Sequence, residues 1–165
     1  MSPAQVERTL TRLAYEIVER NRGADNLLVF GIEAAGARLA RSLARRLSEM
    51  EGRTVESHDL DVTAFRDDTD EDPPAVDPIR GGVDVTDRDI ILVDDVLYTG
   101  RTVRAALDAV IRYGRPRSIQ LMVLIDRGHR EYPIQADYVG RTIPTKSMER
   151  VVVEQADDVT VSVVE

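Results

Sequence analysis

The chain has 165 residues, a length that suits one domain with one sizeable hydrophobic core. Its 30 acidic and 22 basic residues give a net charge of −8, which argues against a generic nucleic-acid-binding domain, because such domains are usually basic. The absence of cysteine excludes disulfides, thiolate zinc sites and a cysteine nucleophile. No apolar run reaches the roughly 18 residues needed to span a membrane, and none resembles a signal peptide, so we expect a cytoplasmic protein that does not bind membranes.

The first third of the chain alternates helical and strand patterns. Apolar residues recur at helical spacing through residues 3–21, which predicts a first helix. The continuous apolar run at residues 27–32 is typical of a strand buried on both faces. We expect a second helix after Gly36, ending at Gly52, and then a strand at about residues 55–65.

The rest of the chain continues the alternation. The predicted elements are a buried strand at 89–93, a helix at 100–113, a strand at 119–125, and shorter strands at 136–140, 150–154 and 159–164. Such alternation predicts an α/β fold with a mainly parallel sheet covered on both faces, in which ligands bind at the carboxyl ends of the strands.

The stretch from Arg66 to Asp84 interrupts this alternation. It is acidic and rich in proline and glycine, so it buries little apolar surface and is predicted to form a long mobile loop. Loops of this length inside a compact domain often serve as lids, although a solvated loop without function is the alternative. We therefore expect one domain, residues 1–165, with a lid loop at about residues 66–84.

The strongest chemical signal follows the strand at 89–93. The loop reads Asp94-Asp95-Val96-Leu97-Tyr98-Thr99-Gly100-Arg101-Thr102 and leads into a helix. Two adjacent carboxylates can accept hydrogen bonds from vicinal hydroxyls or bind a divalent metal. Backbone N–H groups where the helix begins favour a phosphate. The string therefore predicts a ribose 5-phosphate site; an acidic turn before a capped helix is the alternative. Neither a Walker loop nor a dinucleotide fingerprint is present.

Extended to residues 91–106, this string resembles the phosphoribosyl pyrophosphate (PRPP) motif of type I phosphoribosyltransferases. The match is closest to the branch of bifunctional pyrimidine-operon attenuators that are also uracil phosphoribosyltransferases. Further stretches resemble that branch at 10–17, 61–68, 124–134 and 140–145. The 124–134 stretch is similar to the branch's Asp-Arg-Gly-His-Arg-Glu-Leu-Pro segment.

This resemblance implies a type I phosphoribosyltransferase fold, a mainly parallel twisted sheet flanked by helices, with a small hood and a mobile lid loop. It implies that uracil displaces pyrophosphate from PRPP to give UMP, with Mg²⁺ as cofactor. It also implies that UMP or UTP tunes the binding of a messenger RNA leader, which controls transcription of pyrimidine biosynthesis genes by attenuation. A homodimer or homotetramer is expected on the same ground.

The resemblance also implies roles for individual residues. Asp94, Asp95 and Arg127 would be catalytic, with Asp94 and Asp95 holding the ribose hydroxyls and the metal. The residues expected to bind PRPP and its phosphates are Val96, Leu97, Tyr98, Thr99, Gly100, Arg101, Thr102, Ala34, Ala35 and Gly36. Asp126 and Arg127 would form part of the uracil pocket, and Arg66, Asp67 and Asp68 would begin the lid. Tyr98 argues against 6-oxopurine chemistry, because the matching residue in 6-oxopurine transferases is an aspartate.

One loop departs from the branch pattern. Where the branch usually has a basic residue followed by Thr-Arg-Gly, which contacts pyrophosphate, this chain has Glu33, Ala34, Ala35 and Gly36. Backbone N–H groups at Ala35 and Gly36 can still bind phosphate, but losing a charge-assisted contact typically costs about 2–4 kcal/mol in the transition state. We therefore hypothesise weak or lost transferase activity.

RNA binding would depend on basic side chains along the first helix and in the later loops. The candidates are Arg8, Arg12, Arg20, Arg22, His129, Arg130, Arg141, Lys146 and Arg150. Arg8 and Arg12 lie one helical turn apart and can share a face, although a solvated face with local ion pairs is the alternative. The net charge of −8 confines any RNA surface to one patch. We expect His58 at the surface and no histidine zinc site.

Three functions therefore remain open. The first is the bifunctional enzyme and regulator. The second is an RNA-binding, nucleotide-sensing regulator without catalysis, which the Glu33-Ala34-Ala35 sequence favours. The third is a phosphoribosyltransferase for another base without a regulatory role, against which Tyr98 and the 126–134 segment argue.

Overall fold

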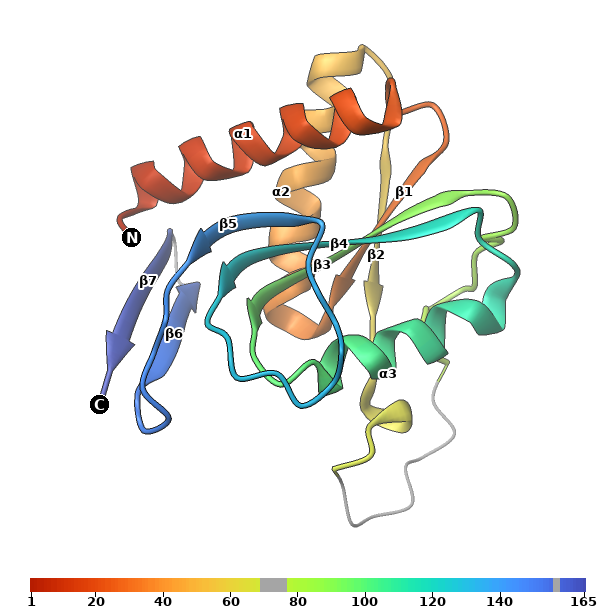
Figure 1. Cartoon of the computed structure of the whole chain (residues 1–165). Helices are drawn as coiled ribbons and strands as arrows, with labels where there is room; N and C mark the ends of the chain where they lie inside the picture. Colours follow the sequence, from red (N-terminus) through yellow and green to blue (C-terminus); the bar gives the residue numbers. More distant parts are fainter. Residues whose placement is uncertain (69–76, 156–157) are drawn as a thin grey trace.

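The computed structural model describes residues 1–68, 77–155 and 158–165. Its helices and strands follow the chain as shown in Figure 1: α1 Pro3–Asn21, β1 Leu27–Ile32, α2 Glu33–Glu51, β2 Glu56–Leu60, β3 Asp89–Leu97, α3 Arg101–Val110, β4 Ser118–Asp126, β5 Tyr138–Thr142, β6 Arg150–Gln155 and β7 Val159–Val164. Short 3₁₀ helices cover Thr63–Phe65 and Ile111–Tyr113. None of the helices in the described ranges combines the length and apolar character that crossing a bilayer requires.

Five strands form one parallel sheet in the order β2-β1-β3-β4-β5. Helices α1 and α2 cover one face and α3 covers the other, as Figure 1 shows. The core is accordingly divided into two hydrophobic clusters, one on each face of the sheet. These features confirm the predicted α/β fold with a mainly parallel, doubly covered sheet.

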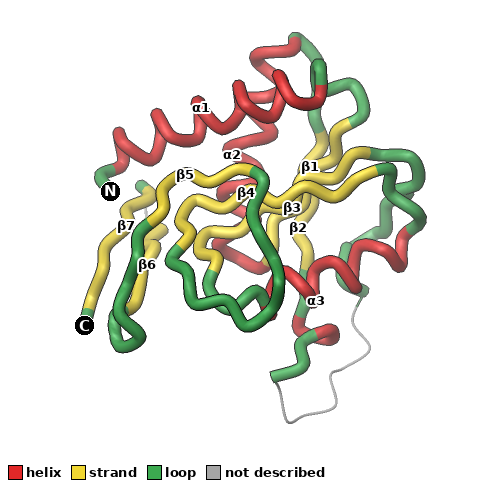
Figure 2. The backbone as a smooth tube through the Cα atoms, in the orientation of Figure 1, coloured by secondary structure: helices red, strands yellow, loops and turns green. Residues whose placement is uncertain are grey.

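The β6–β7 hairpin is antiparallel and separate from this sheet. It lies beside β5 and the start of α1, as Figure 2 shows. The backbone N–H of Val161 donates to the carbonyl oxygen of Met1 at 3.0 Å, and the buried Val161 side chain joins the cluster that α1 and α2 cover. The small hood stays a prediction, and this hairpin, which is separate from the parallel sheet, is the candidate for it.

Several predicted boundaries were wrong, including the strand predicted for 136–140, which is Tyr138–Thr142, and the helix predicted for 100–113, whose α-helical part ends at Val110. Strand β3 continues four residues past 93, because the segment from Asp94 to Leu97 still pairs with the end of β4. The strand predicted for 55–65 ends at Leu60, because the Asp61 carboxylate accepts a hydrogen bond from the Thr63 N–H at 3.0 Å and turns the chain. Helix α2 begins at Glu33 rather than after Gly36, since the alanines at 34 and 35 are strong helix formers.

The predicted lid loop is only partly described. Residues 66–68 and 77–84 contain neither helix nor strand, and residues 69–76 lie outside the described residues. The carbonyl of Pro78 accepts a hydrogen bond from the Asp61 N–H at 2.9 Å, so the far end of the loop returns to the end of β2.

Two glycines bring α2 unusually close to the sheet. A Cβ atom added at Gly36 would lie 2.4 Å from the Val93 carbonyl oxygen, and one added at Gly31 would lie 2.2 Å from the Cα of Ala37. Both neighbours are backbone atoms that a side chain cannot push aside. The first turn of α2 is thereby held against β3 at Val93, just before the two aspartates.

We predict that Gly36→Ala lowers the free energy of unfolding by about 1–3 kcal/mol, because the added methyl group overlaps the backbone of β3. In an unconstrained helix the same change would stabilise by about 1 kcal/mol. Urea denaturation measures the difference. Gly52→Ala serves as the comparison, because its added Cβ meets nothing within 4 Å and its cost comes only from the φ of 65°. A Gly36→Ala protein as stable as the natural chain would contradict the prediction.

Candidate active site

A cavity of about 280 Å³ opens where β3 ends and α3 begins. Most of its lining was predicted from the sequence: Asp94, Val96, Leu97, Tyr98, Thr99, Gly100, Arg101 and Thr102. Arg66 and Asp68 of the predicted lid also line it, together with Val103 and Glu131. The topology explains this convergence, because ligand sites in parallel sheets form at the carboxyl ends of the strands.

The two adjacent aspartates differ in environment. The Asp94 residue is only 7% exposed, and its Oδ1 accepts a hydrogen bond from the Asp95 N–H at 2.9 Å. The Asp95 Oδ1 in turn accepts from the Val96 N–H at 2.7 Å. Burial, and then the negative charges of Asp95 and Glu33, raise the pKa of Asp94 well above its ordinary value. A hydroxyl donor or a cation would relieve this repulsion.

These carboxylates fit a magnesium ion that is shared with a ligand. Within the described ranges, no group of three or more histidine, aspartate or glutamate side chains converges on a point where a metal could sit. Mg²⁺ is usually held by one or two carboxylates together with phosphates and water, rather than by a cage made only of protein ligands. The Asp94–Asp95 pair has that composition.

The turn that follows has the geometry of an anion site. Gly100 has a φ of 91°, a conformation that favours glycine, and it places the start of α3 at the cavity. The Thr99 Oγ1 accepts from the Arg101 N–H at 3.3 Å. Because N–H groups in the first turn of a helix point outward and carry the positive end of its dipole, this position favours a phosphate.

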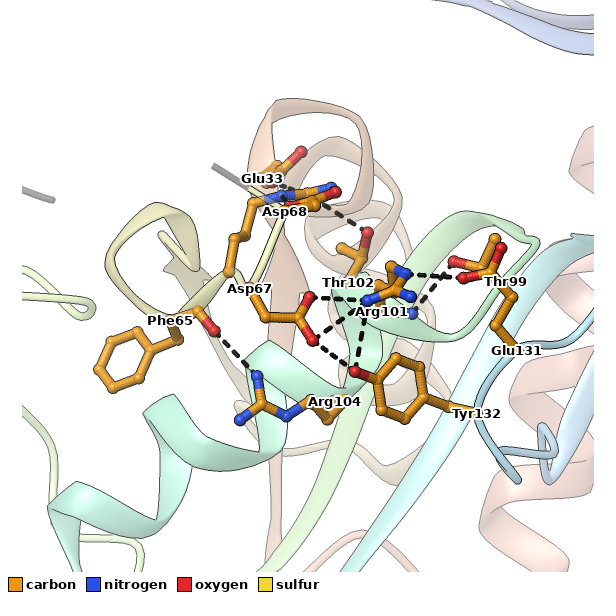
Figure 3. Close-up of polar contacts among 11 residues, drawn as sticks. Glu33, Phe65, Asp67, Asp68, Thr99, Arg101, Thr102, Arg104, Glu131 and Tyr132 are labelled. Atoms are coloured by element: carbon orange, nitrogen blue, oxygen red, sulfur yellow. Dashed lines mark hydrogen bonds and ion pairs between the residues drawn. The ribbon is translucent and has the colours of Figure 1, made fainter. Parts of the chain in front are cut away.

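Arg101 connects the turn to two neighbouring segments, as Figure 3 shows. Its Nε donates to Glu131 at 2.8 Å and its Nη1 donates to both Asp67 oxygens at 3.2 Å. Its guanidinium also lies 5.0 Å from the centre of the Tyr132 ring, and the Tyr132 hydroxyl donates to Asp67. The hydrogen bond from Tyr132, followed by that from Arg101, lowers the pKa of Asp67.

Arg66 contacts the same turn from the other side. Its Nη1 donates to the Thr102 Oγ1 at 3.2 Å and lies 3.4 Å from the Glu33 Oε1. Its Nε and Nη2 donate to the two oxygens of Asp68 at 2.8 and 2.7 Å. The first residues of the predicted lid therefore lie directly on the predicted phosphate site.

The predicted base-binding residues lie behind Tyr98. Arg127 is 7% exposed and donates to the Thr145 Oγ1 at 3.0 Å and to the Glu149 carbonyl at 2.7 Å. Its guanidinium lies 4.0 Å from the centre of the Tyr98 ring. Neither Arg127 nor Asp126 lines the 280 Å³ cavity. Arg127 packs on the Tyr98 ring, whereas Asp126 is linked to Tyr98 through Arg130, which donates to the Tyr98 carbonyl at 3.0 Å.

Asp126 is held by two hydrogen bonds. Its Oδ1 accepts from the Gly128 N–H at 3.0 Å and its Oδ2 accepts from Arg130 at 2.6 Å. Burial acts to raise the pKa of Asp126, but the Arg130 and Gly128 hydrogen bonds outweigh it and hold that pKa below its usual range. Asp126 is therefore ionised and already paired.

The sequence did not predict a second, larger cavity of about 870 Å³ between α2 and β2. Its lining includes Glu33, Ala34, Arg41, Asp59 and Arg80. Ala34, expected at the phosphate site, lines this cavity and not the smaller one, while Gly36 packs against β3. His58 also lines it and was expected at the surface; it is instead half-buried and stacks on Phe30 with ring centres 5.4 Å apart.

Several side chains proposed to contact RNA bind other groups of the protein itself. Arg12 donates to the carbonyls of Val139 and Gly140 at 3.1 and 2.7 Å, and Arg20 pairs with Asp137 at 2.8 Å. Arg130 is held by Asp126 and by the Tyr98 carbonyl, and the His129 ring nitrogen lies 2.6 Å from the Thr145 carbonyl. The remaining candidates, Arg8, Arg22, Arg141, Lys146 and Arg150, are exposed.

The comparisons with known proteins first define the class. A family model described as phosphoribosyl transferase domain matches residues 3–158. A hypoxanthine-guanine phosphoribosyltransferase from Bacillus anthracis superposes with a TM-score of 0.69 at 21% identity, covering 88% of this chain and 82% of that one. A hypoxanthine phosphoribosyltransferase from Staphylococcus aureus gives 0.68 at 19% identity, covering 88% and 77%. Identities this low show the fold alone.

Two bacterial proteins are much more similar in sequence. The Bifunctional protein PyrR of Bacillus subtilis strain 168 is 52% identical over 158 residues, which cover 93% of this chain and 87% of that protein. The Bifunctional protein PyrR of Bacillus cereus strain AH820 is 52% identical over 153 residues, covering 90% and 85%. The chain therefore belongs to the phosphoribosyltransferase family, within its PyrR group.

We predict that Asp94→Asn raises the free energy of unfolding of the metal-free protein by about 1–3 kcal/mol at about pH 7. The amide keeps an oxygen for the Asp95 N–H and removes a buried, repelled charge. Because the folded-state pKa of Asp94 lies above the unfolded value of about 3.9, its penalty is full above the folded-state pKa and vanishes as pH falls towards about 4.

Urea denaturation in a chelating buffer at both pH values tests this expectation, with the exposed Asp158→Asn as control. An Asp94→Asn protein less stable than the natural chain at both pH values would show that the carboxylate contributes net stability.

Proposed function

We propose that this chain transfers the phosphoribosyl group of PRPP to uracil, giving UMP and pyrophosphate, and that it also binds a messenger RNA leader to control pyrimidine biosynthesis genes by attenuation. The observation that carries the enzymatic part is the cavity that joins Asp94, the first residue of the aspartate pair, to the start of α3. A diol-binding pair beside a phosphate-binding turn suits a ribose 5-phosphate. The regulatory part is supported by 52% identity to proteins named bifunctional PyrR.

Each part of the cavity has a role in this proposal. Asp94 and Asp95 accept hydrogen bonds from the ribose hydroxyls, and the turn from Thr99 to Thr102 holds the 5-phosphate. The transition state places positive charge on the ribose ring, so the fixed carboxylates stabilise it without a covalent nucleophile. Mg²⁺, when bound together with PRPP, neutralises phosphate charge and assists the departure of pyrophosphate.

Tyr98 and Arg127 form the wall for the base. Their stacking and the hydrogen bonds that hold Arg127 make this wall rigid before any ligand arrives. A tyrosine at position 98 leaves no carboxylate to handle a purine proton, so uracil is the proposed base and hypoxanthine and guanine are not. Arg127 acts behind Tyr98 and positions it.

The first experiment is UMP synthesis from uracil, PRPP and Mg²⁺, by the natural chain and by the triple variant Glu33→Lys, Ala34→Thr, Ala35→Arg. We expect slow turnover by the natural chain and a gain of about 30–1,000-fold in the variant, because restored charge-assisted contacts are worth about 2–4 kcal/mol. Asp94→Asn should abolish turnover in both backgrounds, and hypoxanthine and guanine should not replace uracil.

Rapid turnover by the natural chain with little gain in the variant would contradict the weakened-activity hypothesis and leave the enzyme proposal standing. A silent natural chain beside an active variant would favour the second candidate function, a nucleotide-sensing regulator without catalysis. The charge of Glu33, which acts on Asp94, is the observation that supports that candidate. Turnover of another base, but not of uracil, would refute the proposal.

The proposed RNA surface lies where α1 meets β5. Arg12 holds the Gly140 carbonyl, so the exposed Arg8 on α1 and the exposed Arg141 on β5 flank this junction. Tyr15 is 61% exposed and lines a shallow groove with Arg8 and Arg12, which offers an aromatic face for a base. A homodimer or homotetramer, proposed from the family resemblance, would present two or more such surfaces.

We expect the double variant Arg8→Ala, Arg141→Ala to weaken binding of a pyrimidine-operon leader RNA at least tenfold and to reduce the salt slope by about two units, one for each lost phosphate contact. UMP or UTP should strengthen binding by the natural chain. Filter binding over a range of salt concentrations measures both effects. Arg53→Ala, which removes an exposed charge paired with Asp25, is the control. An unchanged salt slope in the double variant would place the RNA elsewhere.

A further inference from the structure

The small cavity holds few positive charges for a site that would receive a polyanion. Its lining contains two cationic side chains, Arg66 and Arg101, against the carboxylates of Asp68, Asp94 and Glu131. PRPP carries a 5-phosphate and a pyrophosphate, and the first turn of α2 offers a glutamate where the family resemblance places cations. The pyrophosphate is expected beside this first turn of α2. The contacts of the two arginines therefore decide which of them lies on that side of the cavity.

Arg101 binds Glu131, Asp67 and Tyr132, none of which belongs to α2. Its nitrogens are committed to Glu131 and Asp67, on the side of the turn where Tyr132 lies. Arg66 lies on the opposite side, where its Nη1 spans the gap between the Thr102 Oγ1 and the Glu33 Oε1. Through its contacts with Thr102 and Glu33, Arg66 is thus the cationic side chain that joins the 5-phosphate turn to the start of α2.

The position of Arg66 is fixed by its surroundings. The residue before it, Phe65, is bound through its carbonyl to Arg104 at 3.2 Å, and its ring lies 4.7 Å from the Arg112 guanidinium. Arg104 belongs to α3, the helix whose first turn forms the phosphate site. The Arg66 side chain is 25% exposed and is held at both edges by Asp68. The guanidinium is therefore preorganised toward the cavity and not free in solvent.

We propose that Arg66 is a substrate-binding residue that contacts the pyrophosphate of PRPP and replaces the cations missing from Glu33-Ala34-Ala35. This inference rests on the proposed function and assigns the pyrophosphate side of the same site. An incoming phosphate oxygen takes the place of the Glu33 carboxylate, whose contact with Arg66 is the longest of the four at 3.4 Å. Asp68 continues to orient the guanidinium while the ligand is bound.

The test compares two ligands that differ at the proposed contact. PRPP carries the pyrophosphate, whereas UMP carries the 5-phosphate without it. Calorimetric titrations with Mg²⁺ would measure both affinities for the natural chain, Arg66→Ala and Arg66→Lys. We expect Arg66→Ala to weaken PRPP binding at least tenfold and UMP binding less than threefold. Arg66→Lys should be intermediate for PRPP, since lysine keeps the charge but cannot form the two-edged contact with Asp68.

Two controls separate this role from a structural one. Arg53→Ala removes an exposed arginine that precedes β2 and pairs with Asp25, whereas Arg66 follows β2, so this variant should bind both ligands as the natural chain does. Adding Glu33→Lys, Ala34→Thr and Ala35→Arg to the Arg66→Ala protein should recover most of the lost PRPP affinity. Recovery by charges introduced on α2 would not occur if Arg66→Ala had simply misfolded, and retained UMP binding gives a second check on folding.

Equal losses for PRPP and UMP would overturn the inference, because Arg66 would then serve the 5-phosphate or the fold. Unchanged PRPP binding in Arg66→Ala, or no recovery on restoring the α2 cations, would overturn it as well. A natural chain that binds neither ligand would refute the proposed function itself. If the natural chain binds both and only the Arg66 expectations fail, the proposed function stands without this assignment.

Discussion

The buried carboxylate of Asp94 is the constraint around which the rest of the site is arranged. It lies in the second half of β3 with the Asp95 and Glu33 charges nearby, and the backbone of α2 approaches β3 closely at Gly36. A group of negative charges is a costly feature to keep in a folded protein. It is also an unusual neighbour for a phosphate site, because like charges repel the ligand that the turn is shaped to bind.

The arrangement is understandable if the ligand itself brings groups that neutralise or hydrogen-bond these carboxylates. Hydroxyl groups and a divalent ion bind to the aspartates, while the start of α3 and the two arginines bind the phosphates. Arg66 and Arg101 are each held by carboxylates that lie outside the aspartate pair. The unliganded site therefore contains more carboxylates than arginines, and ligand binding exchanges one set of ion pairs for another.

Much of this could be predicted from the sequence, and the limits are instructive. The strand, paired aspartates and Thr-Gly-Arg-Thr turn are contiguous, so their proximity follows from local structure and the fold class. The contacts of Arg66 with Thr102 and Glu33 join segments more than thirty residues apart, and no periodicity encodes them. Ala34 was misplaced because a family loop was expected where two alanines instead extend α2. The sequence predicted that three arginines are available for RNA, because it does not reveal which carbonyl or carboxylate each side chain binds; they are Arg12, Arg20 and Arg130.

The junction between α1 and β5 has a mechanical consequence. Arg12 holds two carbonyls of β5 and Arg20 holds Asp137 just before it, so the helix is fastened to the strand at two points along its length. Strand β5 is in turn paired with the end of β4, where Asp126 lies behind the base wall. Helix α1, which carries the exposed Arg8, is therefore connected to the end of β4 through the hydrogen bonds of β5. A change in position at the end of β4 would reach the basic surface through these contacts and not through a loop.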